Sequence, residues 1–518
     1  MRSFNNCYKY CVLVPIVLSC VVHLYNPSGF PGIHPDESDY IRKSMHVLAG
    51  LGPQENSSDP IAINNQPYTH PHFGQFFLAA LLGSLGYPNW ISTESLVNSV
   101  EFLYDVPRLL MGILAAVDTF ILYKIAERRY SRAIALVAST LFAVMPVTLL
   151  LRQVYLENIL LPFFLSSILI AFYAKSNKIP ADANPSGINN IGNYALIILS
   201  GIMLGIAIYT KIPLFAMIPI VGYTVFMNSG KRLKIVALWL IPVIAIPFLW
   251  PAYAMYVGEF DLWMDGIKTQ QARLGDQGEN KLLSSFKNIY KIDPVSLILG
   301  IAGLIFAAVK RDYWLLLWVM PFLVLSYFLG WVIYFHLIPI LPAFYISAAL
   351  LIVRAFKFNL WKRIIAPTIV SAMICFGLIA SVLLITLNVN SNQFQAYAFI
   401  VDELKMDSNA TGDNKTKIPA ADVLVGHRMF YWIPTYVFKT PFDTFPRDYL
   451  PTGWNKSHTI LIVTSKSCCC QCPYFKDLYR NTEEIKLFNQ DLDLPNYYPY
   501  TGIISNPSLG KKVSIRTN

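Results

Sequence analysis

Charged residues are scarce in this chain. Only 14% of its 518 residues are Asp, Glu, Lys or Arg, whereas 55% are hydrophobic, and the mean hydropathy is +0.45. Soluble globular domains carry about 25% charged residues. The composition therefore excludes an ordinary soluble protein and indicates an integral, multi-pass membrane protein. The net charge of +10 does not indicate a nucleic-acid partner, because Lys and Arg stand in short clusters between apolar runs.

Polar residues seldom interrupt the apolar runs of this chain. About eleven apolar segments therefore reach or nearly reach the length of a membrane span, roughly 17–25 residues. No clear small-x-small cleavage site follows the first of them, so we expect a retained span rather than a signal peptide. The segments are approximately 10–25, 102–124, 132–151, 156–174, 194–209, 212–228, 234–257, 294–309, 313–330, 336–354 and 363–387. The sequence thus predicts an α-helical polytopic membrane protein.

The basic loops predict the orientation, because Lys and Arg are enriched on the cytoplasmic side. With a cytoplasmic N-terminus, the basic loops at 127–132, 231–234, 310–311 and 354–363 all fall inside. The outside then holds three large segments, 26–101, 258–293 and 388–518. Asn-x-Ser/Thr sites at Asn56, Asn409, Asn414 and Asn455 all lie in these segments. We expect a cell membrane, with an endoplasmic-reticulum membrane as the topologically equivalent alternative.

The tail has no long apolar run, and we divide the chain into a transmembrane domain (1–387) and an extracytoplasmic domain (388–518). Short β-like runs at 422–426 and 459–464 predict a small α/β fold. Four of the eight cysteines crowd into Cys468–Cys472. Adjacent cysteines cannot all turn toward one tetrahedral ion without strain, so we expect no zinc site. A structural or redox role is favoured over catalysis.

An acidic motif just outside the first span, His34-Pro35-Asp36-Glu37, is the strongest sign of chemistry. Two adjacent carboxylates there predict an acid/base group at the membrane surface. Other polar residues fall on the same predicted side. Each fits a structural role by itself, but together they predict a substrate site; they are His70, His72, Arg152, Glu157, Lys211 and His336.

The arrangement fits transfer of a sugar from a lipid-linked phosphate that enters from the bilayer. Lys211 and Arg152 are cations suited to the phosphate. A carboxylate can act as general base for an acceptor hydroxyl arriving from outside. Displacement in one step with a single base inverts the configuration at the anomeric carbon. The leaving phosphate is already stable, so no second carboxyl group is needed as an acid, whereas glycoside hydrolases use a pair of carboxylates. No cofactor or metal is required, although a divalent cation remains an alternative.

These residues resemble the GT-C superfamily of glycosyltransferases, in its protein O-mannosyltransferase-like and aminoarabinose-transferase-like branch. Asp36-Glu37 matches an Asp-Glu motif of the first outer loop, and 70–75 resembles a downstream His-Pro motif, with departures at His72 and Gln75. Glu157 and the run 334–342 also match, as does the turn 210–212, in which Ile212 replaces a Trp. The resemblance covers about residues 10–387. It implies a GT-C fold, Asp36 as base, Glu37 beside the acceptor and Lys211 as the phosphate contact.

The resemblance also implies the partners. These are a polyprenyl- or dolichyl-phosphate sugar, with mannose or a similar hexose, and a protein, lipid or glycan acceptor. Three alternatives stay open: a transporter or flippase of lipid-linked sugars, an oligosaccharyltransferase-like enzyme, and a non-catalytic subunit. The first is disfavoured because no clear internal repeat appears and the charges stand at helix ends. The second is disfavoured because the chain has no Trp-Trp-Asp motif.

Overall fold

A computed structural model of the chain describes fifteen stretches of sequence. They are 11–53, 68–88, 96–174, 188–272, 281–330, 332–354, 364–409, 423–426, 430, 433, 437, 443–446, 459–464, 480–489 and 512–517. The chain forms two compact units. Unit 1 comprises 1–25, 66–74 and 111–382, and unit 2 comprises 26–65, 75–110 and 383–518. Each unit is therefore built from segments that are distant in the sequence.

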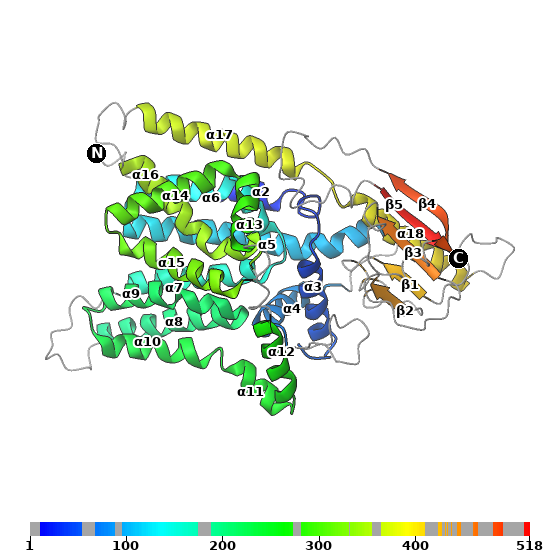
Figure 1. Cartoon of the computed structure of the whole chain (residues 1–518), viewed down its shortest axis with the longest axis horizontal. Helices are drawn as coiled ribbons and strands as arrows, with labels where there is room; N and C mark the ends of the chain where they lie inside the picture. The colour runs from blue at the N-terminus through cyan, green and yellow to red at the C-terminus, as the bar shows by residue number, and fades with distance from the viewer. Residues whose placement is uncertain are drawn as a thin grey trace. The chain divides into compact units, whose positions relative to one another are not determined.

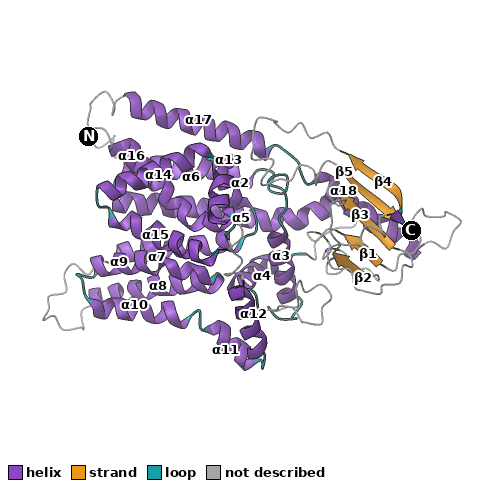
Figure 2. Ribbon diagram, in the orientation of Figure 1, coloured by secondary structure: helices purple, strands orange, loops and turns teal. Residues whose placement is uncertain are grey.

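Unit 1 is built of helices, drawn in purple in Figure 2 and labelled in Figure 1. In chain order they are α2 (Leu13–Leu24), the second half of α5 (Leu96–Arg129), α6 (Arg132–Val144), η2 (Pro146–Arg152), α7 (Leu156–Tyr173), α8 (Ile188–Thr210), η3 (Ile212–Met217), α9 (Ile218–Asn228), α10 (Leu233–Ala245), α11 (Leu249–Tyr256), α12 (Phe260–Ala272), α13 (Lys281–Ile292), α14 (Pro294–Val309), α15 (Tyr313–Leu329), η5 (Tyr334–Ile340), α16 (Leu341–Arg354) and most of α17 (Ala366–Ile385).

The helices support an integral membrane protein. Among the described residues, six are long and apolar enough to cross a membrane, or seven if α6 and η2, bent by 68°, form one span. Each of the eleven segments expected from the sequence contains helix, but four are shorter than a regular span: 13–24, 212–228, 294–309 and 313–329. The number of eleven spans and their orientation stay predictions, because hydropathy does not show where a helix breaks or bends.

Small residues allow the helices of unit 1 to approach closely. A Cβ added to Gly303 of α14 would collide with the backbone of Ser347 in α16. The Ser347 hydroxyl donates to the Gly300 carbonyl at 2.9 Å. Ser167 of α7 and Ser200 of α8 donate to each other's carbonyls at 2.7 and 2.8 Å. Small side chains and interhelical hydrogen bonds are the usual means of helix association in lipid, where apolar burial gives little driving force.

Unit 2 combines helices with a mixed sheet. Its helices are α3 (Pro35–Leu48), most of α4 (Phe73–Ser84), the first half of α5 and α18 (Ser391–Asn409). Its strands, orange in Figure 2, are β1 (Val423–Gly426), β2 (Asp443–Pro446), β3 (Thr459–Thr464), β4 (Glu483–Asn489) and β5 (Lys512–Thr517).

The sheet has the order β2-β1-β3-β5-β4. β1 pairs in parallel with β2 and β3, whereas β5 pairs antiparallel with β3 and β4. Strands thus form at both runs that the sequence favoured for β structure. A separate extracytoplasmic domain at 388–518 stays a prediction. The Cys468–Cys472 cluster and the acceptor sites at Asn56, Asn414 and Asn455 lie outside the described residues.

Candidate functional site: an acidic helix start and a buried lysine

The acidic motif forms the first turn of α3. Pro35 occupies the first helical position, where its missing N–H costs nothing. His34 caps the helix, because its Nδ1 accepts from the Asp36 backbone N–H at 3.2 Å. The Glu37 carboxylate accepts in return from the His34 N–H at 3.5 Å, which completes a capping box. The sequence His-Pro-Asp-Glu therefore fixes the start of this helix locally.

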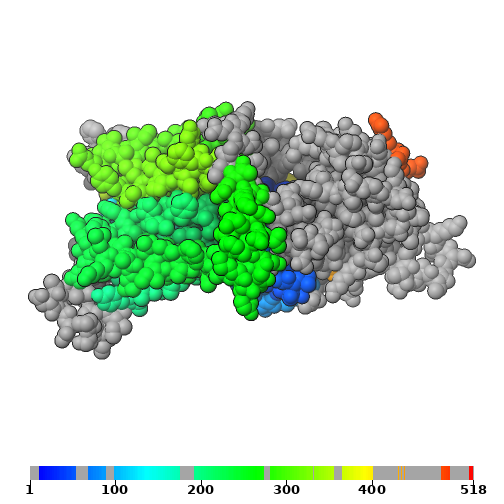
Figure 3. Space-filling view, turned by 60° about the horizontal axis from the view of Figure 1, so that its bottom comes forward, coloured from blue at the N-terminus to red at the C-terminus, as the bar shows by residue number. Residues whose placement is uncertain are grey.

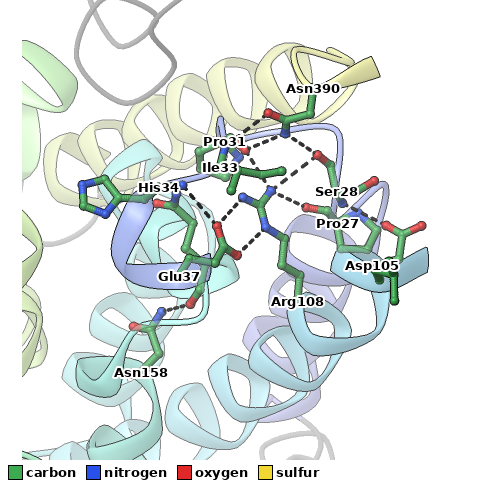
Figure 4. Close-up of polar contacts among 12 residues, drawn as sticks. Pro27, Ser28, Pro31, Ile33, His34, Glu37, Asp105, Arg108, Asn158 and Asn390 are labelled. Carbon is green, nitrogen blue, oxygen red and sulfur yellow. Dashed lines mark hydrogen bonds and ion pairs between the residues drawn. The ribbon is translucent and has the colours of Figure 1, made fainter. Parts of the chain in front are cut away.

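Glu37 is committed to an ion pair with Arg108 of α5. The Arg108 Nε and Nη2 atoms lie 2.7 Å from the two Glu37 carboxylate oxygens, and both side chains are fully buried. Figure 4 shows this two-pronged contact. A buried pair is held by such geometry and by the further hydrogen bonds that satisfy both partners.

Those further bonds tie down the loop that leads into α3. Arg108 Nη1 donates to the carbonyls of Pro27 and Pro31 at 3.0 and 2.8 Å. Asn390, just before α18, donates to the Ser28 carbonyl at 2.6 Å and accepts from the Ile33 N–H at 3.2 Å. Figure 4 shows both side chains converging on this loop. One arginine and one asparagine thus hold the segment that presents Asp36.

Asp36 has a different environment from its neighbour. Its side chain is 33% exposed, and its carboxylate lies 3.8 Å from His34 Nδ1. Adjacent residues of a helix point in directions about 100° apart, so one carboxylate turns into the interior of unit 2 and the other reaches its surface. Asp36 is thus the more exposed of the two carboxylates.

A second cluster of sequence-predicted residues forms in unit 1 around Glu157, in the first turn of α7. The ammonium of Lys211, the N-cap of η3, lies 2.5 Å from a Glu157 carboxylate oxygen. His336 of η5 places Nε2 3.7 Å from the same oxygen. Three of the residues predicted from the sequence therefore meet, although they lie up to 179 positions apart in the chain.

Backbone contacts set the orientation of His336. Its Nδ1 accepts from the Ile333 N–H at 3.3 Å. The neutral ring must then carry its proton on Nε2, the atom that faces Glu157. Glu157 thus accepts from Lys211 and can accept from His336. Because the carboxylate is buried, its charge depends on these partners.

An aromatic wall lines this cluster. The rings of Tyr155 and Phe335 stack at 4.3 Å with 6° between their planes. The Lys211 ammonium lies 6.0 Å from the centre of the Phe335 ring, at the limit of a cation–π contact. Lys211 therefore sits in a poorly hydrated environment, where its attraction to an anion is stronger than in water.

The other residues predicted from the sequence lie elsewhere in unit 1. Arg152, fully buried at the end of η2, donates to the Tyr25 carbonyl at 2.6 Å. His72 is buried between the rings of Tyr68 and Tyr253, at 5.4 and 5.6 Å. His70 is half-buried in the bend before α4. The structure brings Lys211, Glu157 and His336 together, and it places Arg152 and His72 in contacts of their own.

The 68–73 segment is anchored on α11 and α12. The Tyr68 hydroxyl donates to Glu259 at 2.7 Å. Burial, then this hydrogen bond, raises the pKa of Tyr68 above its ordinary value. Tyr68 also packs with Tyr209, Trp250 and Ala254. In Figure 3, the bright green residues of about 250–290, which include α12, form a ridge that crosses the neighbouring helices of unit 1. Gln270 of α12 donates to the Thr69 carbonyl at 3.3 Å, so this helix contacts the segment directly.

Several of these positions were not identified from the sequence. Arg108 is the one that the sequence could most easily have identified, because a charged residue inside an apolar run is by itself a functional signal. Asn390, Tyr155 and Phe335 carried no such signal, since their importance follows only from tertiary contacts. Within the described residues, no three His, Cys, Asp or Glu side chains are grouped so that they could hold a metal ion.

Comparison with known proteins agrees with the resemblance seen in the sequence. Residues 47–262 match the family model described as dolichyl-phosphate-mannose-protein mannosyltransferase. The matched segment contains Lys211, Glu157 and Arg152 but begins after Asp36. The match supports a glycosyltransferase. None of the curated protein sequences matches the chain.

Two solved structures share the fold of this chain. ArnT from Cupriavidus metallidurans, bound to undecaprenyl phosphate, has a TM-score of 0.57 and 13% identity, with 98% of this chain and 97% of that chain covered. The oligosaccharyltransferase from Archaeoglobus fulgidus, tethered with an acceptor peptide that contains the NVT sequon, has a TM-score of 0.51 and 14% identity. That match covers 85% of this chain but only 64% of the archaeal one.

Proposed function

We propose that the chain is a membrane glycosyltransferase that moves a hexose, such as mannose, from a polyprenyl or dolichyl phosphate to an acceptor hydroxyl on the extracytoplasmic side. One observation carries this proposal. Of the two adjacent carboxylates, Glu37 is committed to Arg108, which leaves Asp36 at the surface of unit 2. A single available base suits displacement of a phosphate leaving group, whereas hydrolysis uses two carboxylates.

The proposed step takes place in one displacement. Asp36 accepts the proton of the acceptor hydroxyl as its oxygen attacks the anomeric carbon. The bond between that carbon and the phosphate oxygen breaks, and the electron pair leaves with the lipid phosphate. The configuration at the anomeric carbon inverts. Glu37 and Arg108 position Asp36 and do not exchange protons with substrate, because their buried charges satisfy each other.

We assign the phosphate contact to Lys211. A phosphate bound there competes with Glu157 for the ammonium, and His336 offers Glu157 a second partner. Arg152 is a weaker candidate, since one of its nitrogens is committed to the Tyr25 carbonyl. The undecaprenyl phosphate in the ArnT structure supports a donor of this class. The acceptor peptide in the archaeal structure supports a protein acceptor.

The test is transfer by the purified full-length protein, given a panel of radiolabelled polyprenyl-phosphate sugars and acceptor peptides that contain Ser or Thr. We expect one donor to give a labelled product of inverted configuration. Asp36→Asn keeps the size and hydrogen-bonding shape of the side chain but not its basicity, and should lower the rate by roughly 10²–10⁴. The control is Asp265→Asn, a carboxylate of α12 whose side chain is 67% exposed.

Three results would count against the proposal. Near-normal turnover by Asp36→Asn removes this carboxylate from the mechanism. Retention of configuration excludes the single displacement. Movement of labelled lipid between leaflets of a vesicle, with no labelled product from any donor, favours a transporter or flippase instead. Localisation in the cell membrane rather than the endoplasmic reticulum stays part of the proposal and is tested by fractionation.

A further inference from the structure

Helix α13 presents a mixed basic and apolar face that no other described element covers. Its buried side carries Ser285, Ile289 and Ile292. The Ser285 hydroxyl donates to the Val332 carbonyl at 2.6 Å, which attaches this side of the helix to the segment leading into η5. The opposite side is exposed and carries residues spaced by three and four positions: Leu283, Lys287, Tyr290 and Lys291. Such spacing places them on one face of the helix.

The next helix shows where the bilayer begins. Only Asp293 separates α13 from α14. The large exposed side chains of α14 are all aliphatic and form a stripe: Ile298, Ile301, Ile305 and Val309, each 42–73% exposed. An aliphatic stripe of this kind is suited to lipid chains and not to water. The exposed surface therefore changes from aliphatic to basic and aromatic at Asp293, as expected at the headgroup level of a membrane.

The composition of α13 fits an anionic surface. The helix contains three Lys residues and no Asp or Glu between 281 and 292. Leu283 and Tyr290 are 53% and 52% exposed. In the part of the chain that the structure describes, no carboxylate lies within ion-pair distance of the Lys287 or Lys291 ammonium. Apolar and aromatic side chains beside free ammonium groups are typical of helices that lie in the interface and bind acidic lipids.

We propose that the face of α13 formed by Leu283, Lys287, Tyr290 and Lys291 binds the headgroups of anionic phospholipids of the surrounding leaflet. Charge complementarity selects this occupant, because two ammonium groups at the bilayer surface meet phosphates there. The α13 face is continuous with the exposed aliphatic stripe of α14, so the acyl chains of the bound lipid would lie along that stripe. The proposal is independent of the transfer reaction, since it uses none of the residues assigned to that site.

The experiment adds phosphatidylglycerol or phosphatidylcholine to delipidated full-length protein in neutral detergent. Bound lipid is counted by native mass spectrometry, and Tm is followed in parallel. We expect phosphatidylglycerol to bind and to raise Tm more than phosphatidylcholine. A lysine near an anionic surface contributes about 5-fold in affinity, so Lys287→Gln with Lys291→Gln should weaken phosphatidylglycerol binding by about 30-fold.

Two control proteins make the result specific. Lys287→Arg with Lys291→Arg keeps both charges and should bind like the parent chain. Lys268→Gln removes an exposed lysine of α12 that already pairs with Asp265 at 2.9 Å, and should change nothing. Equal binding of the two lipids, or an unchanged affinity in the double Gln variant, would overturn the proposal. Stabilisation by inorganic phosphate as large as that by phosphatidylglycerol would show an anion site instead of a lipid surface.

Discussion

Glu37 and Asp36 are adjacent, and the structure predicts that their neutral variants fail in different ways. In Glu37→Gln, the Arg108 guanidinium loses its charged partner while remaining fully buried. Removing one member of a buried ion pair typically costs about 3–5 kcal/mol. For a unit of about two hundred residues, this lowers Tm by on the order of 10 °C. Asp36→Asn breaks no such pair and should change Tm little.

The assay is thermal unfolding of the purified protein in detergent, with Glu127→Gln as control. Glu127 also pairs with two cations, Lys124 and Arg132, but these pairs lie at the surface, where the expected cost is at most about 1 kcal/mol. Adding Arg108→Gln to Glu37→Gln removes the unpaired charge and should restore part of the stability. If Glu37→Gln were no less stable than Glu127→Gln, the positioning role of this pair would be refuted.

Three further predictions concern unit 1. Lys211→Ala should weaken donor binding about 10- to 150-fold, since a charged contact contributes roughly 1.5–3 kcal/mol; unchanged donor affinity in equilibrium binding would leave Lys211 as a structural partner of Glu157 only. Burial raises the pKa of Asp293 to about 6, so the folded state holds this proton more tightly and stability falls as the pH rises from about 4 to 6. Asp293→Asn keeps the helix cap and should remove that fall, gaining at most about 3 kcal/mol above pH 6; melting curves at pH 4–8 that stay parallel to those of the parent would contradict it. Tyr68→Phe loses the bond to Glu259 and should destabilise the protein by roughly 1.5–3 kcal/mol, whereas Tyr256→Phe, at an 89% exposed position, should melt like the parent.

The sequence alone determined the class of the protein and the start of its acidic helix. Composition and apolar runs set the membrane environment, because each span must satisfy its own backbone hydrogen bonds and bury an apolar surface in lipid. The order His34-Pro35-Asp36-Glu37 contains its own cap, a local interaction that needs no distant partner. Their shared predicted side of the membrane and the family resemblance predicted Glu157, Lys211 and His336 as site residues, and the structure brings these three together.

Only the tertiary structure decided what each of these residues contacts. The sequence does not distinguish the neighbouring acids Asp36 and Glu37. The structure does, because Arg108, 71 positions after Glu37, forms a buried ion pair with Glu37. From the sequence, Lys211 is a cation with no identified partner, whereas the structure pairs its ammonium with the Glu157 carboxylate. Helix breaks likewise depend on packing, as at the 68° bend between α6 and η2. Long-range ion pairs and bends arise from contacts between segments that the local sequence does not encode.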